Sequence, residues 1–236
     1  MSDSKHKFYT IEVMCALATA ILIFLSIIQV SLAIPPKFEL YPNNAKVDGL
    51  SYSEWTAKWW EWLTNIPKEQ NPGLDTSGEH CSVGQTGTVW FLAGTMGGSA
   101  ERQCQIKQGD SILFSIIGGY CSYTTDATTK TESDLRNCAR TGNDDAELQV
   151  SVDGIYLKNL EQSRITTEPF PITYMKDNVY GIAVGNTTAV ADGYYVFLKP
   201  LAPGAHEIHF KGSIIENPAI GVVGNAVDVK YNIIVK

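Results

Sequence analysis

Positive charge is scarce in this chain of 236 residues. The sequence has 18 Lys and Arg against 25 Asp and Glu, which gives a formal net charge of −7. Proteins that bind nucleic acid need a basic surface to neutralise phosphates, so this balance argues against a nucleic-acid partner. It favours solubility and says little else about partners.

Several chemical motifs are also missing. No serine lies in a G-x-S-x-G turn, which removes the commonest hydrolase signal. No two cysteines have the short spacing typical of zinc ligands, and no cysteine is followed closely by the histidine and methionine of a blue-copper site. We therefore expect no metal and no cofactor, and we rank a non-enzymatic protein above an enzyme.

The N-terminus has the layout of an export signal. Lys5 and Lys7 precede an uncharged, largely apolar run over residues 13–34. Small residues at positions 31 and 33 stand before two prolines, so cleavage after Ala33 is our preferred interpretation, although the run is long enough to remain as an anchor across ~30 Å of hydrocarbon. Both alternatives predict an extracytoplasmic protein, secreted or held at the cell membrane only by this N-terminal helix.

The sequence predicts three segments along the chain. We expect residues 1–33 to be a signal peptide or anchor, 34–50 to be a linker or a strand lying against the domain, and 51–236 to form a single domain. An even number of cysteines in an exported domain predicts two disulfides. Of the three possible pairings we favour the one that closes two short loops, Cys81–Cys104 and Cys121–Cys138.

A tryptophan-rich helix opens the domain. Ser51 and Glu54 have the spacing of a capping box, and Pro67 ends the helical pattern. At helical spacing one face carries Tyr52, Trp55, Trp59, Trp62, Leu63 and Ile66. This face is expected to pack on the core, whereas Trp60 falls at its margin and is our candidate for ligand contact, because indole rings bind sugars and cations.

Short β-rich segments follow, and they predict a mainly β fold. We expect about eight strands in an antiparallel β-sandwich, with the tryptophan helix packed at its edge and a short second helix over 132–140. Residues 102–106 and 111–117 have the pattern of a strand-turn-strand unit, and Asp153-Gly154 is the strongest hairpin signal.

Two groups of polar residues are candidates for chemistry. Asp75, Glu79 and His80 crowd beside Cys81 and would suit acid–base catalysis or a cation, although a solvated turn explains them equally well. His206 and His209 alternate on a strand, so their rings should point to opposite faces and should not chelate a metal together. Convergence of Asp75, His80 and His206 in one cleft would favour an enzyme.

Asn186-Thr187-Thr188 is a glycosylation sequon, which predicts a surface loop around Asn186.

Several motifs together resemble an uncharacterised family of secreted prokaryotic proteins. They are Trp55-x3-Trp59-Trp60-x-Trp62, Asn71-Pro72, Asp75-x2-Gly78-x2-Cys81, Gln85-x-Gly87-x-Val89-Trp90-Phe91-Leu92-Ala93-Gly94, Arg102-x-Cys104 and Pro200-Leu201-x-Pro203-Gly204-x-His206. The resemblance covers most of the chain after residue 50. It implies one exported domain and assigns no catalytic residue.

Two functional hypotheses remain. The first is an exported, disulfide-stabilised module that binds a partner protein or a glycan at the cell envelope, with Trp60 in its site. The second is a secreted hydrolase or metal-dependent enzyme centred on Asp75, Glu79 and His80. We rank the binding module first, because the sequence contains no catalytic constellation.

Overall fold

The computed structural model describes residues 38–125 and 128–236. Within that part the chain forms two α-helices and 12 strands, so the fold is mainly β, as predicted. The predicted export signal lies outside the described residues. No helix in the described ranges is both long and apolar enough to cross a membrane.

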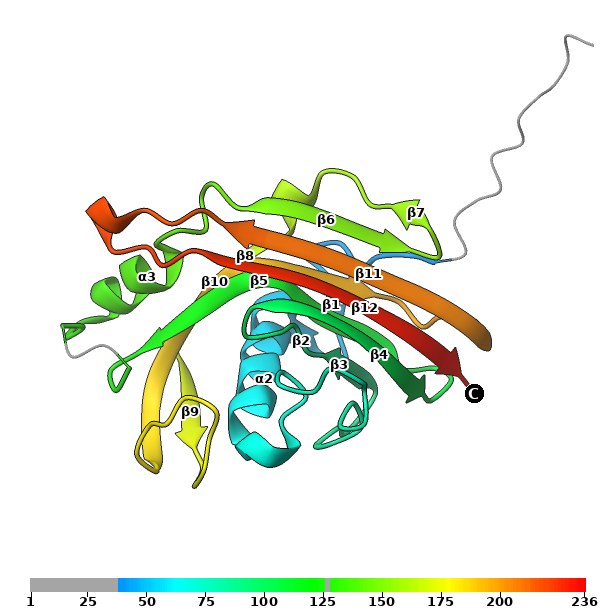
Figure 1. Cartoon of the computed structure of the whole chain (residues 1–236), viewed down its shortest axis with the longest axis horizontal. Coiled ribbons are helices and arrows are strands. Elements are labelled where there is room, and N and C mark those ends of the chain that lie inside the picture. Colours follow the sequence, from blue (N-terminus) through cyan, green and yellow to red (C-terminus); the bar gives the residue numbers. More distant parts are fainter. Residues whose placement is uncertain (1–37, 126–127) are drawn as a thin grey trace, which may run out of the picture. The chain divides into compact units, whose positions relative to one another are not determined.

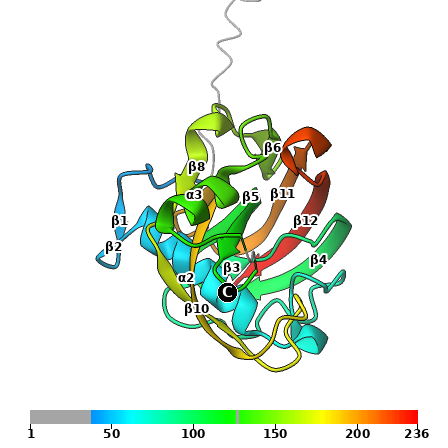
Figure 2. The ribbon, with the colours of Figure 1, turned by 90° about the vertical axis from the view of Figure 1, so that its left-hand side faces the viewer.

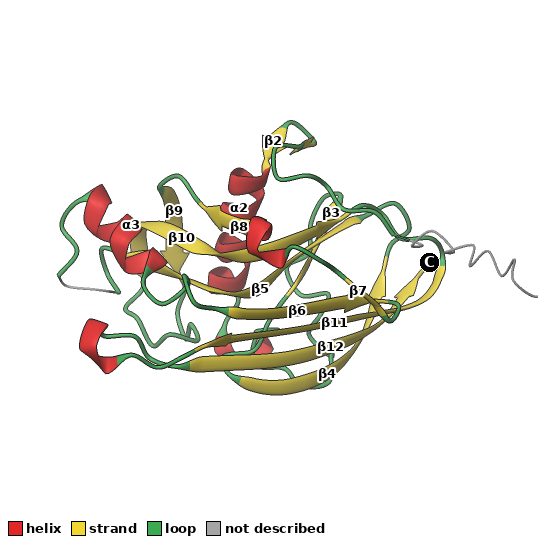
Figure 3. Cartoon of the chain, turned by 90° about the horizontal axis from the view of Figure 1, so that it is seen from above, coloured by secondary structure: helices red, strands yellow, loops and turns green. Residues whose placement is uncertain are grey.

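Two five-stranded sheets lie face to face (Figures 1 and 3). The first sheet has the order β3-β5-β10-β8, with β9 also paired to β10, and contains β3 (Val89–Leu92), β5 (Ser111–Ser122), β8 (Arg164–Thr166), β9 (Phe170–Tyr174) and β10 (Gly185–Leu198). The second sheet has the order β4-β12-β11-β6-β7 and contains β4 (Gly98–Ile106), β6 (Glu147–Val152), β7 (Ile155–Tyr156), β11 (Gly204–Ile214) and β12 (Asn225–Val235). A small separate sheet pairs β1 (Lys46–Val47) with β2 (Leu50–Ser51).

The main core lies between the two large sheets. Phe114 of the first sheet stacks on Phe210 of the second, with ring centroids 4.8 Å apart, and both side chains are fully buried. The alternation of buried and exposed residues along β4, β11 and β12 is the pattern of strands with one face inside. The strands that the sequence pattern missed, β1, β2, β8 and β9, have five residues or fewer.

The topology differs from the expected all-antiparallel arrangement at two places. Strand β3 runs parallel to β5, and β4 runs parallel to β12. The reason is that the predicted strand-turn-strand unit is not a hairpin: residues 107–110 carry the chain from β4 in the second sheet to β5 in the first. The Asp153-Gly154 hairpin between β6 and β7 is confirmed.

The tryptophan helix, α2 (Tyr52–Asn65), begins as predicted. The Ser51 N–H donates to Glu54 Oε2 at 2.7 Å, and the Glu54 N–H donates to Ser51 Oγ at 3.3 Å. The helix packs on the sheet, and the surface that it covers is the outer face of the first sheet, on the side away from β4 and β12 (Figure 2). Phe91 and Phe197 make this face apolar, so it can bury the wide aromatic stripe that a sheet edge could not.

The segment before α2 also lies against the first sheet. The Tyr41 N–H donates to the Phe197 carbonyl at 2.9 Å, and Leu40 forms an isolated bridge with Leu198. The described residues from 38 onward therefore lie against the domain, but through one isolated bridge rather than as a regular strand.

Both favoured disulfide pairings are present. Cys81 is bonded to Cys104 with a Cα–Cα distance of 6.0 Å, and Cys121 is bonded to Cys138 with a Cα–Cα distance of 5.9 Å. The second bond ties the predicted helix α3 (Glu132–Arg140) to β5. Two disulfides indicate a protein that matures in an oxidising compartment outside the cytoplasm.

Candidate functional site

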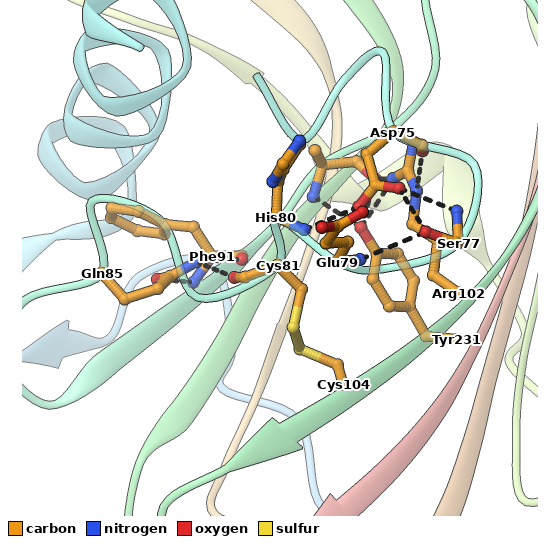
Figure 4. The surroundings of a disulfide bond; sticks show 11 residues. Asp75, Ser77, Glu79, His80, Cys81, Gln85, Phe91, Arg102, Cys104 and Tyr231 are labelled. Atoms are coloured by element: carbon orange, nitrogen blue, oxygen red, sulfur yellow. Dashed lines mark hydrogen bonds between the residues drawn. A yellow bond between two sulfur atoms is a disulfide. The ribbon is translucent and has the colours of Figure 1, made fainter. Parts of the chain in front are cut away.

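The Asp75 carboxylate organises its own loop. Its Oδ1 accepts from the Ser77 N–H at 2.8 Å and the Ser77 hydroxyl at 2.9 Å, and its Oδ2 accepts from the His80 backbone N–H at 2.9 Å (Figure 4). Partial burial acts to raise the pKa of Asp75, but donation from these backbone groups outweighs it and lowers that pKa. Since Asp75 bonds to the backbone of His80 rather than to its ring, the contact shapes a turn.

A buried arginine holds this loop from below. Arg102, 1% exposed, donates from Nε to the Asp75 carbonyl at 2.7 Å. Its Nη1 donates to the Tyr231 hydroxyl at 2.6 Å (Figure 4) and to the Ala93 carbonyl at 2.5 Å, and its Nη2 donates to the Gly94 carbonyl at 3.0 Å. Three of these four acceptors are backbone carbonyls, and the fourth is the Tyr231 hydroxyl. Arg102 therefore joins the loop, the end of β3 and β12.

The three residues whose convergence would favour an enzyme do not line one cleft. An open hollow of about 880 Å³ is lined by Glu79, Asp153 and His206, but neither Asp75 nor His80 lines it. The ring nitrogens of His206 contact Asp153 Oδ2 and the Ala202 carbonyl, each at 2.8 Å. His206 is thus a buried histidine with both ring nitrogens engaged.

His209 lies on the other side of β11. Its Nε2 contacts Asp228 Oδ1 at 2.6 Å, and the same carboxylate pairs with Lys211 at 2.7 Å. The prediction that the two histidine rings point to opposite faces is confirmed. In residues 38–125 and 128–236, no group of three or more His, Cys, Asp or Glu side chains is placed to hold a metal ion.

All four tryptophans of α2 are buried, and each indole N–H is satisfied. Trp55 donates to the Val47 carbonyl, Trp59 to the Leu92 carbonyl and Trp62 to the Val83 carbonyl, at distances of 2.8, 3.0 and 2.9 Å. Core packing of these three is confirmed. Trp60 is also only 7% exposed, and its N–H donates to the Tyr195 hydroxyl at 2.8 Å.

Trp60 nevertheless borders a second hollow of about 250 Å³. The lining comes from six parts of the chain: the C-terminal half of α2, Gly73 after it, the β3–β4 connection with Met96, residues 115–120 of β5, Tyr180 from the β9–β10 connection, and the start of β12. None of the lining residues carries a charge. We call this hollow the aromatic hollow.

The tyrosines around the aromatic hollow are neutral hydroxyl groups. Burial raises the pKa of Tyr120 above its usual range, and the neighbouring Tyr180 and a hydrogen bond with Tyr174 raise it further. Burial likewise raises the pKa of Tyr180 and Tyr195. Sequence analysis missed Tyr120, Tyr180 and Met96 because they are far apart in the sequence, and no local pattern links them to Trp60.

Asn186 is exposed but does not lie in a loop. It is the second residue of β10 and pairs with Thr173 of β9. The loop prediction was wrong, because a sequon indicates only that its asparagine is accessible, and a residue on an exposed part of a strand is accessible as well.

Comparison with known proteins shows no family for this chain. No protein-family model matches it and no curated protein matches it, so the resemblance to secreted prokaryotic proteins is not confirmed. A solved structure, the cysteine protease inhibitor EhICP2 from Entamoeba histolytica, matches with 11% sequence identity over 59% of this chain and 88% of that chain. Its TM-score of 0.21 supports no inference about fold or function. The class that fold and cysteines define is a disulfide-bonded, β-rich domain.

Proposed function

We propose that this protein is a non-enzymatic binding module that works outside the cytoplasm and holds a partner polypeptide in the aromatic hollow. The observation that carries this proposal is the uncharged lining of the hollow in a chain whose net charge is −7. The lining is mainly indole, phenol and aliphatic groups, with only uncharged polar groups on Thr95, Ser115 and Asn225, and such a lining suits an apolar or aromatic side chain of a partner. Met96, 44% exposed at the rim, adds an adaptable apolar contact.

The same geometry favours a polypeptide over a glycan. A sugar ring stacks on an open indole face, but the Trp60 ring is flanked by Trp59 and Tyr120, each with ring centroids 4.8 Å away. Only a small part of the indole surface therefore borders the hollow. Such a site binds a side chain that inserts beside the aromatic rings rather than one that lies flat on them.

The test begins with a photo-cross-linking amino acid at position 96 of the full chain in its native host. Met175 is the matched control, because it is 45% exposed and does not line the hollow. We expect an adduct with a polypeptide at position 96 that is absent at position 175. The purified partner should then bind Met96→Lys about tenfold more weakly, because a charge at the rim must be desolvated, and should bind Met175→Lys as it binds the wild type.

Identical adducts at the two positions, or equal affinities for the two lysine variants, would contradict the proposal. Binding to a glycan array that is lost in Met96→Lys and kept in Met175→Lys would also contradict it, in favour of a sugar ligand.

A further inference from the structure

Strand β5 is much longer than β3, which pairs with one of its two edges. On one side β10 accompanies β5 from Ile112 to Ser122. On the other side β3 pairs only with Ser111–Phe114. Beyond Phe114, therefore, no strand among the described residues pairs with this edge of β5.

The backbone groups that face this edge follow from the register. At the start of β5 the Ser111 N–H donates to the Thr88 carbonyl, so odd-numbered residues face β3. The pairing with β10 shifts between Tyr194 and Tyr195, where β5 has one extra residue. An extra residue reverses the alternation, so beyond this bulge the even-numbered residues face away from β10.

Hydrogen bonds at the end of β5 agree with this assignment. The odd-numbered Tyr123 donates its N–H to a carbonyl of β10. The even-numbered Ser122 donates its N–H to the Thr125 hydroxyl at 2.8 Å, on the other side. Gly118 and Tyr120 thus direct their N–H and C=O groups to the edge that has no strand partner.

The aromatic hollow follows this edge. Six consecutive residues, 115–120, line it, whereas one face of a strand would contribute only alternate residues. Gly118, Gly119 and Tyr120 are partly exposed, so this end of the edge can be reached from solvent. Natural proteins block such edges with charged residues, proline or a covering loop, and residues 115–120 contain no charge and no proline.

We propose that an extended, uncharged segment of the partner polypeptide adds to β5 as an extra strand, bonded to the backbone of Gly118 and Tyr120. This inference rests on the proposed function and specifies its mode. Backbone donors and acceptors of one strand recur every ~7 Å on each side, a spacing that another extended chain matches. Gly119 leaves room beside the edge, because an added Cβ there meets nothing within 4 Å, and a side chain of the added strand reaches Trp60 and Tyr180.

The experiment uses a displayed library of random peptides of about ten residues, long enough for one strand, selected against the full chain. The best peptide is then synthesised with N-methyl groups on alternate backbone nitrogens, in both registers. In an added strand only every second N–H bonds to β5, so one register should lose at least about tenfold in affinity while the other keeps it. Hydrogen exchange at the amides of Gly118 and Tyr120 should slow when the peptide binds.

Two pairs of variants test the edge itself. Tyr120→Pro and Tyr120→Val both lose the aromatic ring, but only proline removes the N–H, so Tyr120→Pro should bind the peptide about tenfold more weakly than Tyr120→Val. Should Tyr120→Pro fail to fold, Gly119→Lys serves instead, because a side chain at Gly119 meets nothing within 4 Å. Its added charge should weaken binding relative to Met175→Lys.

The outcomes separate the two proposals. If no library peptide binds the full chain, both fail. If a peptide binds and is weakened by Met96→Lys, but both methylation registers and both Tyr120 variants behave alike, strand addition fails and the proposed function stands. Slow exchange of Gly118 and Tyr120 in the free protein would also overturn strand addition, because the edge would already be covered by this chain or a second copy.

Discussion

Two sheet edges of this domain, those of β4 and β5, differ in how far other parts of the chain cover them. The loop of residues 75–81 covers the edge of β4, and three consecutive residues of β4 hold this covering loop. Arg102 donates to the Asp75 carbonyl, the Gln103 N–H donates to the Ser77 carbonyl at 2.9 Å, and Cys104 forms the disulfide with Cys81. Beyond Phe114, β5 has no such cover within the described chain. An uncovered edge is an aggregation hazard, so a fold that protects one edge by several means and leaves another open points to use of the open one.

The largest expected effect comes from removing the arginine beneath the covering loop. Arg102→Leu leaves the part-buried carbonyls of Asp75 and Gly94 without this donor and removes one of two donors from the buried Ala93 carbonyl and the Tyr231 hydroxyl. We expect a loss of roughly 3 to 5 kcal/mol in the free energy of unfolding. Denaturant titration measures it. The control is Arg136→Leu, which breaks exposed ion pairs with Glu132 and Glu168 and should cost about 1 kcal/mol or less. Equal losses would mean that Arg102 anchors nothing.

The next effect separates the two disulfides. Replacing Cys81 and Cys104 by alanine, or Cys121 and Cys138 by alanine, should each cost about 3 kcal/mol on the loop-entropy model, given sequence separations of 23 and 17. Only the first pair fixes the loop over β4. Amide exchange at Gln103 should therefore become fast in the first variant and stay slow in the second. The same exchange rate in both would show that the loop covers β4 without the disulfide.

A smaller effect tests the contact between loop and edge. In Gly78→Ala the new Cβ would lie 2.2 Å from the Gln103 carbonyl oxygen, so the loop must lift from β4. Gly87→Ala is the matched control, because Gly87 also has positive φ but has nothing within 4 Å of an added Cβ. Both variants suffer the backbone strain, and we expect Gly78→Ala to lose roughly 2 kcal/mol more than Gly87→Ala. A thermal-melt difference near zero would place the loop away from β4 in solution.

How much of this contrast the sequence predicts depends on the range of the interactions. The helix start at Ser51 and Glu54, the second helix and the cysteine pairing follow from local spacing, and all are confirmed. The covered and open edges depend on the crossing of the chain between sheets after β3 and after β4, which no local pattern records. The strand predicted over 111–117 also ends too early, because close pairing of Gly118 with Gly193 of β10 carries β5 through Gly118 and Gly119.

The aromatic hollow was predictable only in part. Trp60 was singled out because it falls at the margin of the helical stripe, and it does border the hollow.

The buried position of Arg102 could also have been predicted from the sequence. It alternates with Cys104 and Ile106, so it shares their inward face, and a buried arginine at that position must find acceptors in the neighbouring loops. The acceptors themselves come from distant segments that only the fold brings together.

The smallest expected effect concerns the Asp75 turn and depends on pH. Its pKa in the folded protein lies below the usual value of about 3.9, because donation from the backbone outweighs burial, so the charged form stabilises the fold. Asp75→Asn should cost about 1 kcal/mol at neutral pH, and this difference from the wild type should shrink as the pH falls below about 4, where Asp75 itself takes up a proton. Burial raises the pKa of Asp110, so Asp110→Asn should change the pH dependence in the opposite sense. Denaturant titrations of the three proteins from neutral to acid pH decide the matter: parallel curves for Asp75→Asn and the wild type would show that the carboxylate does not hold the turn that covers β4.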